Sequence, residues 1–420
     1  MRLRFLLQAS IAAFGTYFCM YAFRKPFTVA TFENLAFLGI NYKILLIIAQ
    51  VVGYTLSKFV GIKVISEMKS NKRMYYLIGF ILFAELSLLG FAVVPAPYNI
   101  IFLFLNGLPL GMIWGIVFSY LEGRKATELL GVILSSSFIV SSGAVKTIGK
   151  LVLDKFQINE FWMPFVTGVI FILPLLFFAW MLEKLPAPTK TDKLLRAVRK
   201  PLNKQERKQL FKNYALPLSL IVFFFMLLTS IRDFRDNFAR EIWDALGYTD
   251  ATIYSISEIP IAIIVLVVLG VIGSVTKNYK AFIYYHYVLI VGCFSILVST
   301  YLYQQQVISP LVWMVVSGLG LYSCYVPFNG IFFDRMIATF KIKGNVGFLI
   351  YIADAFGYLG SILILLYKNF GKRDISWLSF FTQALYLLAI IGLGVSVYCY
   401  HFFKNKYKKP IEIQKLVYEQ

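Results

Sequence analysis

The chain has 420 residues, of which 59% are hydrophobic and 15% are charged, and its formal net charge is +20. A soluble globular domain has about a quarter of its residues charged, so this composition excludes an ordinary soluble domain and indicates a membrane protein. The basic residues lie mainly between apolar segments, where they report membrane topology, and we expect no nucleic-acid binding.

Mostly apolar stretches long enough to span a bilayer recur along the whole chain. We predict twelve of them, near residues 5–30, 41–66, 74–94, 97–120, 128–152, 161–184, 213–240, 248–275, 281–303, 308–334, 343–368 and 377–402. The first is too long for a signal peptide and has no small-residue cleavage site. Lysine and arginine are concentrated before the first segment, between the sixth and seventh, and after the twelfth. The positive-inside rule therefore places both termini in the cytoplasm.

The first segment carries two adjacent cations in the stretch YAFRKPF, Arg24 and Lys25. An arginine at the centre of a membrane helix costs roughly 2.5–3.5 kcal/mol on insertion scales, although a long side chain can snorkel to the membrane surface instead. Tyr17, Tyr21 and Arg24 share one helical stripe, which favours a polar site over snorkelling. Pro26 removes a backbone donor and is expected to kink the helix beside this site.

The chain divides into two similar halves. We predict a six-helix half at 1–184, a basic cytoplasmic linker at 185–212, a second six-helix half at 213–403 and a cytoplasmic tail at 404–420. A single offset of 211 residues carries Gly107 onto Gly318, Arg124 onto Arg335, and FRKPF (23–27) onto FRDNF (234–238). We therefore predict an all-α polytopic membrane protein with twelve transmembrane helices in two six-helix pseudo-repeats, the major facilitator fold.

The repeat places Arg24 and Arg235 at matching positions in the first helices of the two halves. In the predicted fold these helices face each other across a central cavity, and the halves rock around a substrate near the midplane. Two guanidinium groups in one cavity repel each other unless an anion lies between them, and both can bind phosphate or carboxylate bidentately. The pair therefore predicts a small anionic substrate.

Three motifs resemble one transporter family. The pattern Tyr17-x3-Tyr21-x2-Arg24-Lys25-x-Phe27 resembles the first helix of the organophosphate:phosphate antiporters, the glycerol-3-phosphate and hexose-phosphate transporters of the major facilitator superfamily. YTLSKF (54–59) resembles their second-helix motif, with Thr55 in place of a glycine, and SNKR (70–73) resembles the basic loop that follows. GMIWG (111–115) and EGRK (122–125) resemble the fourth helix and its exit loop. The resemblance covers most of the first half and little of the second.

This resemblance implies a monomeric antiporter of the bacterial inner (plasma) membrane that exchanges a phosphorylated metabolite for phosphate or another anion. It implies that Arg24 is one of two phosphate-clamping arginines, that Lys25 lies near the site, and that Lys58 is a cavity lysine. Lys58 can equally snorkel to the cytoplasmic surface. The second clamp is Arg232 or Arg235: the internal repeat favours Arg235, and the family pattern can be aligned with either.

The chain also departs from the family pattern. The family has a histidine in its fifth helix, whereas this chain has FIVSSG (138–143). Ser141, Ser142 and Lys146 can take over that polar role, although serines in membrane helices often bond to their own backbone. The departure leaves the counter-substrate open.

The second half has more acidic residues than a simple anion site needs. We expect Asp233 and Asp236 to pair with Arg232, Arg235 or Lys146, whereas Glu258 and Asp354 can either pair or carry protons. The alternatives are a proton-coupled transporter of another charged solute that uses Glu258 and Asp354, and a non-transporting membrane sensor or scaffold. We find no cofactor motif, no metal framework and no catalytic constellation, so we do not expect an enzyme.

Overall fold

The computed structural model describes residues 3–418 except 69, 122–126, 187–203, 330, 341, 343–345 and 372–374. The predicted EGRK loop and most of the predicted linker lie outside the described residues. In the part that is described, helices account for nearly all of the regular structure, and the one sheet is a two-stranded hairpin.

The first apolar segment is interrupted close to Pro26. It contains three elements: α1 (Leu3–Met20), η1 (Tyr21–Phe23) and η2 (Pro26–Val29). Interrupting a helix frees backbone carbonyl groups that need donors inside a membrane. The side-chain amide of Asn106 donates to the carbonyl of Phe23 at 2.9 Å, and that of Gln50 donates to the carbonyl of Arg24 at 3.0 Å. The predicted kink is therefore a short stretch of 3-10 helix held by two amide side chains.

The rest of the first half consists of one short hairpin and five long helices. These elements are β1 (Ala36–Phe37), β2 (Ile40–Asn41), α2 (Tyr42–Glu67), η3 (Ser70–Lys72), α3 (Arg73–Val93), α4 (Ile100–Leu121), α5 (Thr127–Asp154) and α6 (Met163–Glu183). The strands pair antiparallel, with Ala36 opposite Asn41, and Gly39 in the turn has a φ of +72° that suits glycine. Each predicted segment from 41 to 184 thus contains one long helix.

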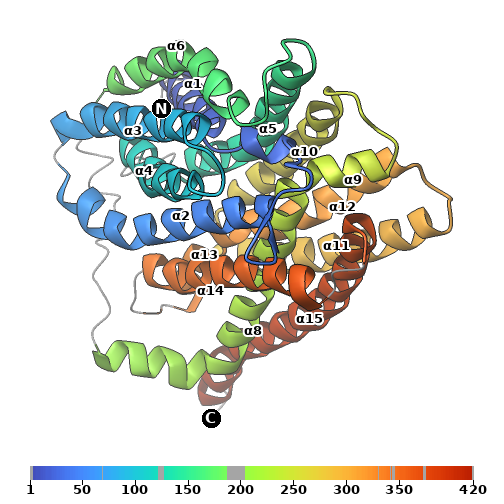
Figure 1. The fold of residues 1–420 in the computed structure, drawn as a ribbon. Coiled ribbons are helices and arrows are strands. Elements are labelled where there is room, and N and C mark those ends of the chain that lie inside the picture. Colours follow the sequence, from blue (N-terminus) through green and yellow to red (C-terminus); the bar gives the residue numbers. More distant parts are fainter. Residues whose placement is uncertain are drawn as a thin grey trace. The chain divides into compact units, whose positions relative to one another are not determined.

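Glycines bring α2 and α4 into close contact along their length (Figure 1). A Cβ atom on Gly107 would clash with the backbone carbonyl of Gln50, and one on Gly111 would lie 2.6 Å from the carbonyl oxygen of Tyr54. A Cβ atom on Gly53 would likewise clash with the carbonyl of Phe104. These glycines act in helix packing, as small residues commonly do in membrane bundles. The contact also fixes the position of Tyr54, which belongs to the candidate site.

Two helices of the second half, α8 and α15, are longer than the sequence predicts. The elements of this half are α8 (Lys204–Asn237), α9 (Ala239–Ala245), α10 (Ile253–Gly273), α11 (Asn278–Gln304), α12 (Pro310–Tyr325), η4 (Val326–Asn329), α13 (Ile331–Phe340), α14 (Val346–Leu366), η5 (Tyr367–Gly371) and α15 (Trp377–Tyr418). Helix α8 begins inside the stretch predicted as a linker, and α15 continues through the predicted tail. Both extensions are rich in lysine, glutamate and glutamine, which favour helix.

The described chain forms two compact units. Unit 1 contains Met1–Arg196, Asp233–Leu266 and Ile362–Phe380, and unit 2 contains Ala197–Arg232, Val267–Ser361 and Phe381–Gln420. Unit 1 therefore includes α1 to α6 together with the end of α8, all of α9 and most of α10. This grouping follows spatial contacts and does not test the predicted duplication, so the boundaries at 1–184 and 213–403 stay a prediction.

Within unit 1, α1 packs against α5 and α6, and α3 packs against α4 and α6 (Figure 1). Within unit 2, α11 packs against α12 and α13. Gly357 of α14 lies close to Thr229 of α8, where an added Cβ atom would be 3.0 Å from the threonine hydroxyl. The same small-residue packing therefore operates in both units.

Among the described residues, eleven helices are long and apolar enough to span a membrane. Eleven of the twelve predicted segments contain one of these helices. The remaining segment, 343–368, contains α14, which has 21 residues. The chain is thus an all-α polytopic membrane protein, as its composition predicts.

Candidate functional site

Arg24 lies in unit 1 among tyrosines from two helices. Its guanidinium carbon is 3.9 Å from the ring centroid of Tyr54 and 5.9 Å from that of Tyr21. The Tyr17 and Tyr21 rings are in edge contact at 5.6 Å, and Lys58 Nζ is 5.6 Å from the Tyr54 ring. We call these five residues the tyrosine group. Two cations contact the Tyr54 ring, an arrangement that cation–π attraction stabilises.

The predicted stripe of Tyr17, Tyr21 and Arg24 therefore does form a continuous set of contacts. Tyr54 was not predicted as a site residue, although it is the first residue of the YTLSKF motif. Its role depends on the close packing of α2, which no single motif reveals. Lys58 is half-buried beside Tyr54, so one cation predicted as a cavity residue lies next to the tyrosines.

Asp236 lies where α8 ends, and it is the centre of a buried ionic group. Its carboxylate forms salt bridges with Lys25 and Lys146 and accepts a hydrogen bond from the Ser142 hydroxyl. Lys146 also donates to the backbone carbonyl of Asp236 at 2.5 Å, and Lys25 donates to the side-chain oxygen of Asn237 at 2.8 Å. One buried carboxylate thus holds two buried ammonium groups.

A second buried ion pair lies one residue earlier on α8. Arg235 pairs with Glu258 of α10, and the Arg235 residue is only 2% exposed. Gly143 of α5 allows this approach, because a Cβ atom there would be 2.6 Å from the carbonyl oxygen of Tyr254 and 3.0 Å from the Cβ of Glu258. The two ionic groups together form what we call the charged cluster, which consists of Lys25, Lys146, Arg235, Asp236 and Glu258.

Arg24 and Arg235 therefore have different surroundings. Arg24 is half-buried against tyrosine rings, whereas Arg235 is fully buried and bound to a carboxylate. The equivalence that the internal repeat predicts does not extend to their contacts. Arg235 is thus held by a carboxylate, whereas Arg24 contacts aromatic rings.

A third ionic contact joins the start of α2 to α9. Lys43 Nζ is 2.5 Å from the Glu241 carboxylate and donates to the Thr28 carbonyl at 2.7 Å. Burial raises the pKa of Glu241, and the neighbouring Lys43 ammonium opposes that rise. The sequence alone does not indicate this pair, because its two residues are 198 positions apart in the chain.

The serine run of α5 divides between two functions. Ser142 faces Asp236, whereas Ser141 donates to the backbone carbonyl of Ser137 in its own helix. Lys146 and Ser142 were predicted to take the place of the fifth-helix histidine of the organophosphate antiporters. In the structure Lys146 forms a salt bridge with Asp236, and Ser142 donates a hydrogen bond to it. Ser141 has the packing role that is common for serine in membrane helices.

The other predicted residues lie outside these groups. In unit 2, the guanidinium carbon of Arg232 is 4.0 Å from the ring centroid of Tyr325, and Asp354 is half-buried in α14. Asp233 is half-buried at the end of α8 in unit 1. In the part of the chain that the structure describes, no three His, Cys, Asp or Glu side chains are arranged to hold a metal ion.

Glu85 is a buried acid that the sequence analysis missed. It lies in the middle of α3 and is 5% exposed, and neither carboxylate oxygen has a hydrogen-bond partner among the described residues. It faces Gly168 of α6, where an added Cβ atom would clash with the carboxyl group. An unpaired carboxylate in an apolar environment is costly, so the site suits the neutral acid best. A lone glutamate inside an apolar run was the available signal.

We expect Glu85→Gln to leave the thermal unfolding midpoint in detergent nearly unchanged, because the amide has the size of the neutral acid. Gly168→Ala should lower the midpoint, at a cost of about 1–3 kcal/mol for overpacking. Thermal unfolding of the purified variants measures both effects. A large loss of stability in Glu85→Gln would show that Glu85 is instead ionised and bound to a cation.

Comparisons with known proteins support the fold. The crystal structure of the nucleoside transporter NupG matches with a TM-score of 0.61 and 15% sequence identity, over 96% of this chain and 100% of that chain. The crystal structure of a NupG point mutant matches with a TM-score of 0.60 and 14% identity, over 95% of this chain and 100% of that chain. At this identity the likeness shows the major facilitator fold alone.

No curated protein matches the chain. The model of a family of unknown function, DUF5690, matches residues 26–406. This range begins at Pro26, just after Arg24 and Lys25, and ends inside α15. The chain therefore belongs to the family of unknown function DUF5690.

Proposed function

We propose that the protein is a secondary active transporter of a small anionic metabolite, one that carries a phosphate group. The fold supports transport by alternating access. Exchange against phosphate or another anion is part of the proposal, through the resemblance of its first-half motifs to the organophosphate antiporters. We further propose the bacterial inner membrane as its location, with both termini in the cytoplasm.

The observation that carries this proposal is the position of Arg24 in the tyrosine group. Its guanidinium lies over the Tyr54 ring at 3.9 Å, with Lys58 near the same ring. The planar guanidinium fork matches the geometry of a phosphate, which accepts from it in bidentate geometry. The neighbouring tyrosine hydroxyls are additional donors.

We also propose roles within the predicted set of residues. We assign anion binding to Arg24, with Tyr17, Tyr21 and Lys58 as its neighbours. Lys25, Lys146 and Ser142 hold Asp236, and Glu258 holds Arg235. In unit 2, Arg232 is stacked on Tyr325 at 4.0 Å, and the choice between Arg232 and Arg235 as a second clamp stays a prediction.

The test is ligand binding to the purified protein by thermal shift and calorimetry. We expect inorganic phosphate, glycerol phosphate or a hexose phosphate to stabilise the wild type. Arg24→Ala should weaken that binding by at least about tenfold, because hydrogen bonds to a charged group contribute roughly 1.5–3 kcal/mol. Arg240→Ala is the matched control, since Arg240 pairs with Asp244 near the surface and lies outside the site.

Uncharged nucleosides form the contrasting ligand set. Stabilisation by nucleosides alone, with no response to any phosphate compound, would contradict the proposal. Equal phosphate binding in Arg24→Ala and wild type would remove Arg24 from the site. Exchange is then measured in vesicles, where uptake of the identified compound should depend on anion trapped inside.

A proton-coupled transporter of another charged solute is the second candidate function. Glu258 favours it, because Oε2 of this buried carboxylate has no hydrogen-bond partner among the described residues while the other oxygen binds Arg235. Protonation of Glu258 would release that arginine. This candidate expects uptake to follow an imposed pH gradient and Glu258→Gln to abolish that dependence. Asp354 is the corresponding acid to test in unit 2.

A further inference from the structure

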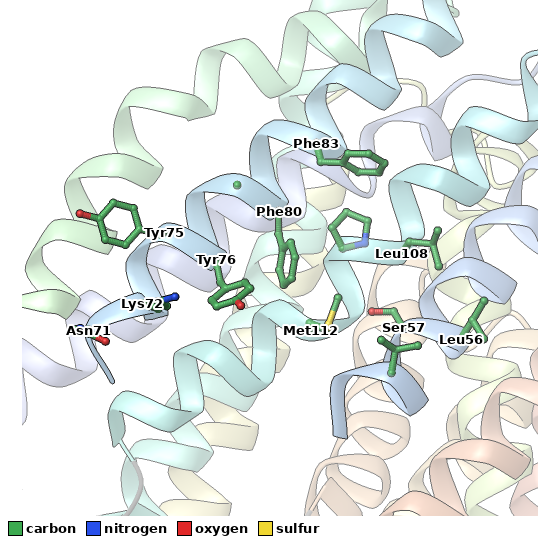
Figure 2. Close-up of a pocket in the computed structure, with 13 residues that line it drawn as sticks. Leu56, Ser57, Asn71, Lys72, Tyr75, Tyr76, Phe80, Phe83, Leu108 and Met112 are labelled. Atoms are coloured by element: carbon green, nitrogen blue, oxygen red, sulfur yellow. The ribbon is translucent and has the colours of Figure 1, made fainter. Parts of the chain in front are cut away.

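A large apolar groove lies on unit 1, and the residues that line it are different from those assigned to anion binding. It has a volume of about 930 Å³, which is near the upper end of ligand pockets, roughly 300–1,000 Å³. Figure 2 shows its walls, which come from α2, α3 and α4. They include Leu56, Gly79, Phe80, Phe83, Leu108 and Met112.

Part of the groove lining consists of exposed side chains of α2 and α3. Leu56, Val60 and Phe83 line it and are about half exposed, at 47%, 50% and 47%. Both helices are long and apolar enough to cross a membrane. Their outward apolar faces therefore contact the hydrocarbon of the bilayer, and the molecules available to fill the groove are lipids.

The groove has one polar end. Asn71 and Lys72 lie in η3, just before α3, and Tyr75 and Tyr76 lie in the first turn of α3. All four line the groove (Figure 2). Tyrosines and lysines of this kind mark the level of the lipid headgroups. Lys72 to Phe83 spans about 16 Å at 1.5 Å per residue. That is about half of a hydrocarbon core of roughly 30 Å, the depth of one leaflet.

We propose that this groove holds the acyl chain of an anionic phospholipid whose phosphate group lies at Lys72. The apolar walls take the chain, the tyrosines lie at the headgroup level, and the ammonium supplies the charge that an anionic headgroup complements. In the orientation predicted from the basic loops, the lipid belongs to the cytoplasmic leaflet, which is the leaflet rich in anionic lipid.

Two glycines provide a matched pair of test variants. A Cβ atom on Gly79 or on Gly270 would meet nothing within 4 Å, so larger side chains fit at both positions without a clash at the backbone. Gly79 lines the groove, whereas Gly270 lies on α10, outside it. Gly79→Trp therefore fills the groove, and Gly270→Trp adds the same side chain elsewhere on the membrane-facing surface.

The experiment incubates the full chain in detergent with phosphatidylglycerol or phosphatidylcholine, and counts retained lipids by native mass spectrometry. We expect the wild type to retain one phosphatidylglycerol that Gly79→Trp loses and Gly270→Trp keeps. Lys72→Gln should weaken phosphatidylglycerol binding by about fivefold, the contribution of one lysine near an anionic surface. Phosphatidylcholine should bind more weakly and should not respond to Lys72→Gln.

Three outcomes would overturn the proposal. Full retention of the lipid by Gly79→Trp would place the lipid elsewhere, and equal binding of the two lipids would remove the role of charge.

The third outcome concerns Ser57, which lines the deep end of the groove and whose buried hydroxyl has no hydrogen-bond partner among the described residues. A hydrocarbon chain cannot bond to it, so Ser57→Ala should leave lipid binding unchanged. Weaker binding in Ser57→Ala would mean a ligand with a polar group at that end.

Discussion

Asp236→Asn is expected to destabilise the protein by about 3–5 kcal/mol, the usual cost of removing one partner from a buried ionic group. Asp236 is the one carboxylate that Lys25 and Lys146 share in the charged cluster. Its loss leaves two buried ammonium groups close together without the carboxylate that they share. The effect is measured as a lower thermal unfolding midpoint in detergent, compared with the wild type prepared in the same way.

Two further variants show whether the effect has this cause. Lys146→Met leaves the Lys25–Asp236 pair in place and should be less damaging than Asp236→Asn. Asp244→Asn breaks the Arg240–Asp244 pair, whose side chains are 18% and 34% exposed, and should cost less than about 1 kcal/mol. If Lys146→Met were as damaging as Asp236→Asn, the stability would come from Lys146 itself and not from charge balance.

The helices and their approximate ends could be predicted because they depend on local composition. Apolar runs of membrane-spanning length identify the spans, and Pro26 marks the break after α1 because it has no backbone N–H. The contact between Tyr17 and Tyr21 fits helical spacing, although Tyr21 and Arg24 lie beyond the end of α1. Where the helices are longer than predicted, as in α8, the reason is a polar extension that hydropathy does not detect.

The pairings within the candidate site could not be predicted because they join distant parts of the chain. The Lys25–Asn237 hydrogen bond spans 212 residues, and the Lys146–Asp236 contact spans 90. The sequence shows adjacent charges near the end of α8. It does not show that Asp236 pairs with two lysines while Arg235 pairs with Glu258. The internal repeat matched Arg24 with Arg235 by position, yet their partners come from other helices and differ.

The contact between α5 and α10 offers the sharpest test of alternating access. The hydroxyl oxygens of Thr147 and Ser255 are 2.8 Å apart, and Gly143 allows the two helices to approach closely. Helix α5 belongs to the first predicted half and α10 to the second. Rocking of the halves requires such contacts to open at one stage of the cycle, so a covalent bond at this point should stop transport.

We therefore expect the double variant Thr147→Cys/Ser255→Cys to lose transport almost completely when oxidised and to recover it in a thiol reductant. A disulfide of about 2.05 Å can replace the hydroxyl contact, and the four native cysteines are buried, which limits side reactions. The measurement is exchange of the compound that stabilises the wild type, with peptide mass spectrometry to confirm the cross-link. The two single variants, oxidised in parallel, should keep their activity. Transport at the wild-type rate by the fully cross-linked protein would contradict this prediction. It would show that α5 and α10 stay together throughout the transport cycle.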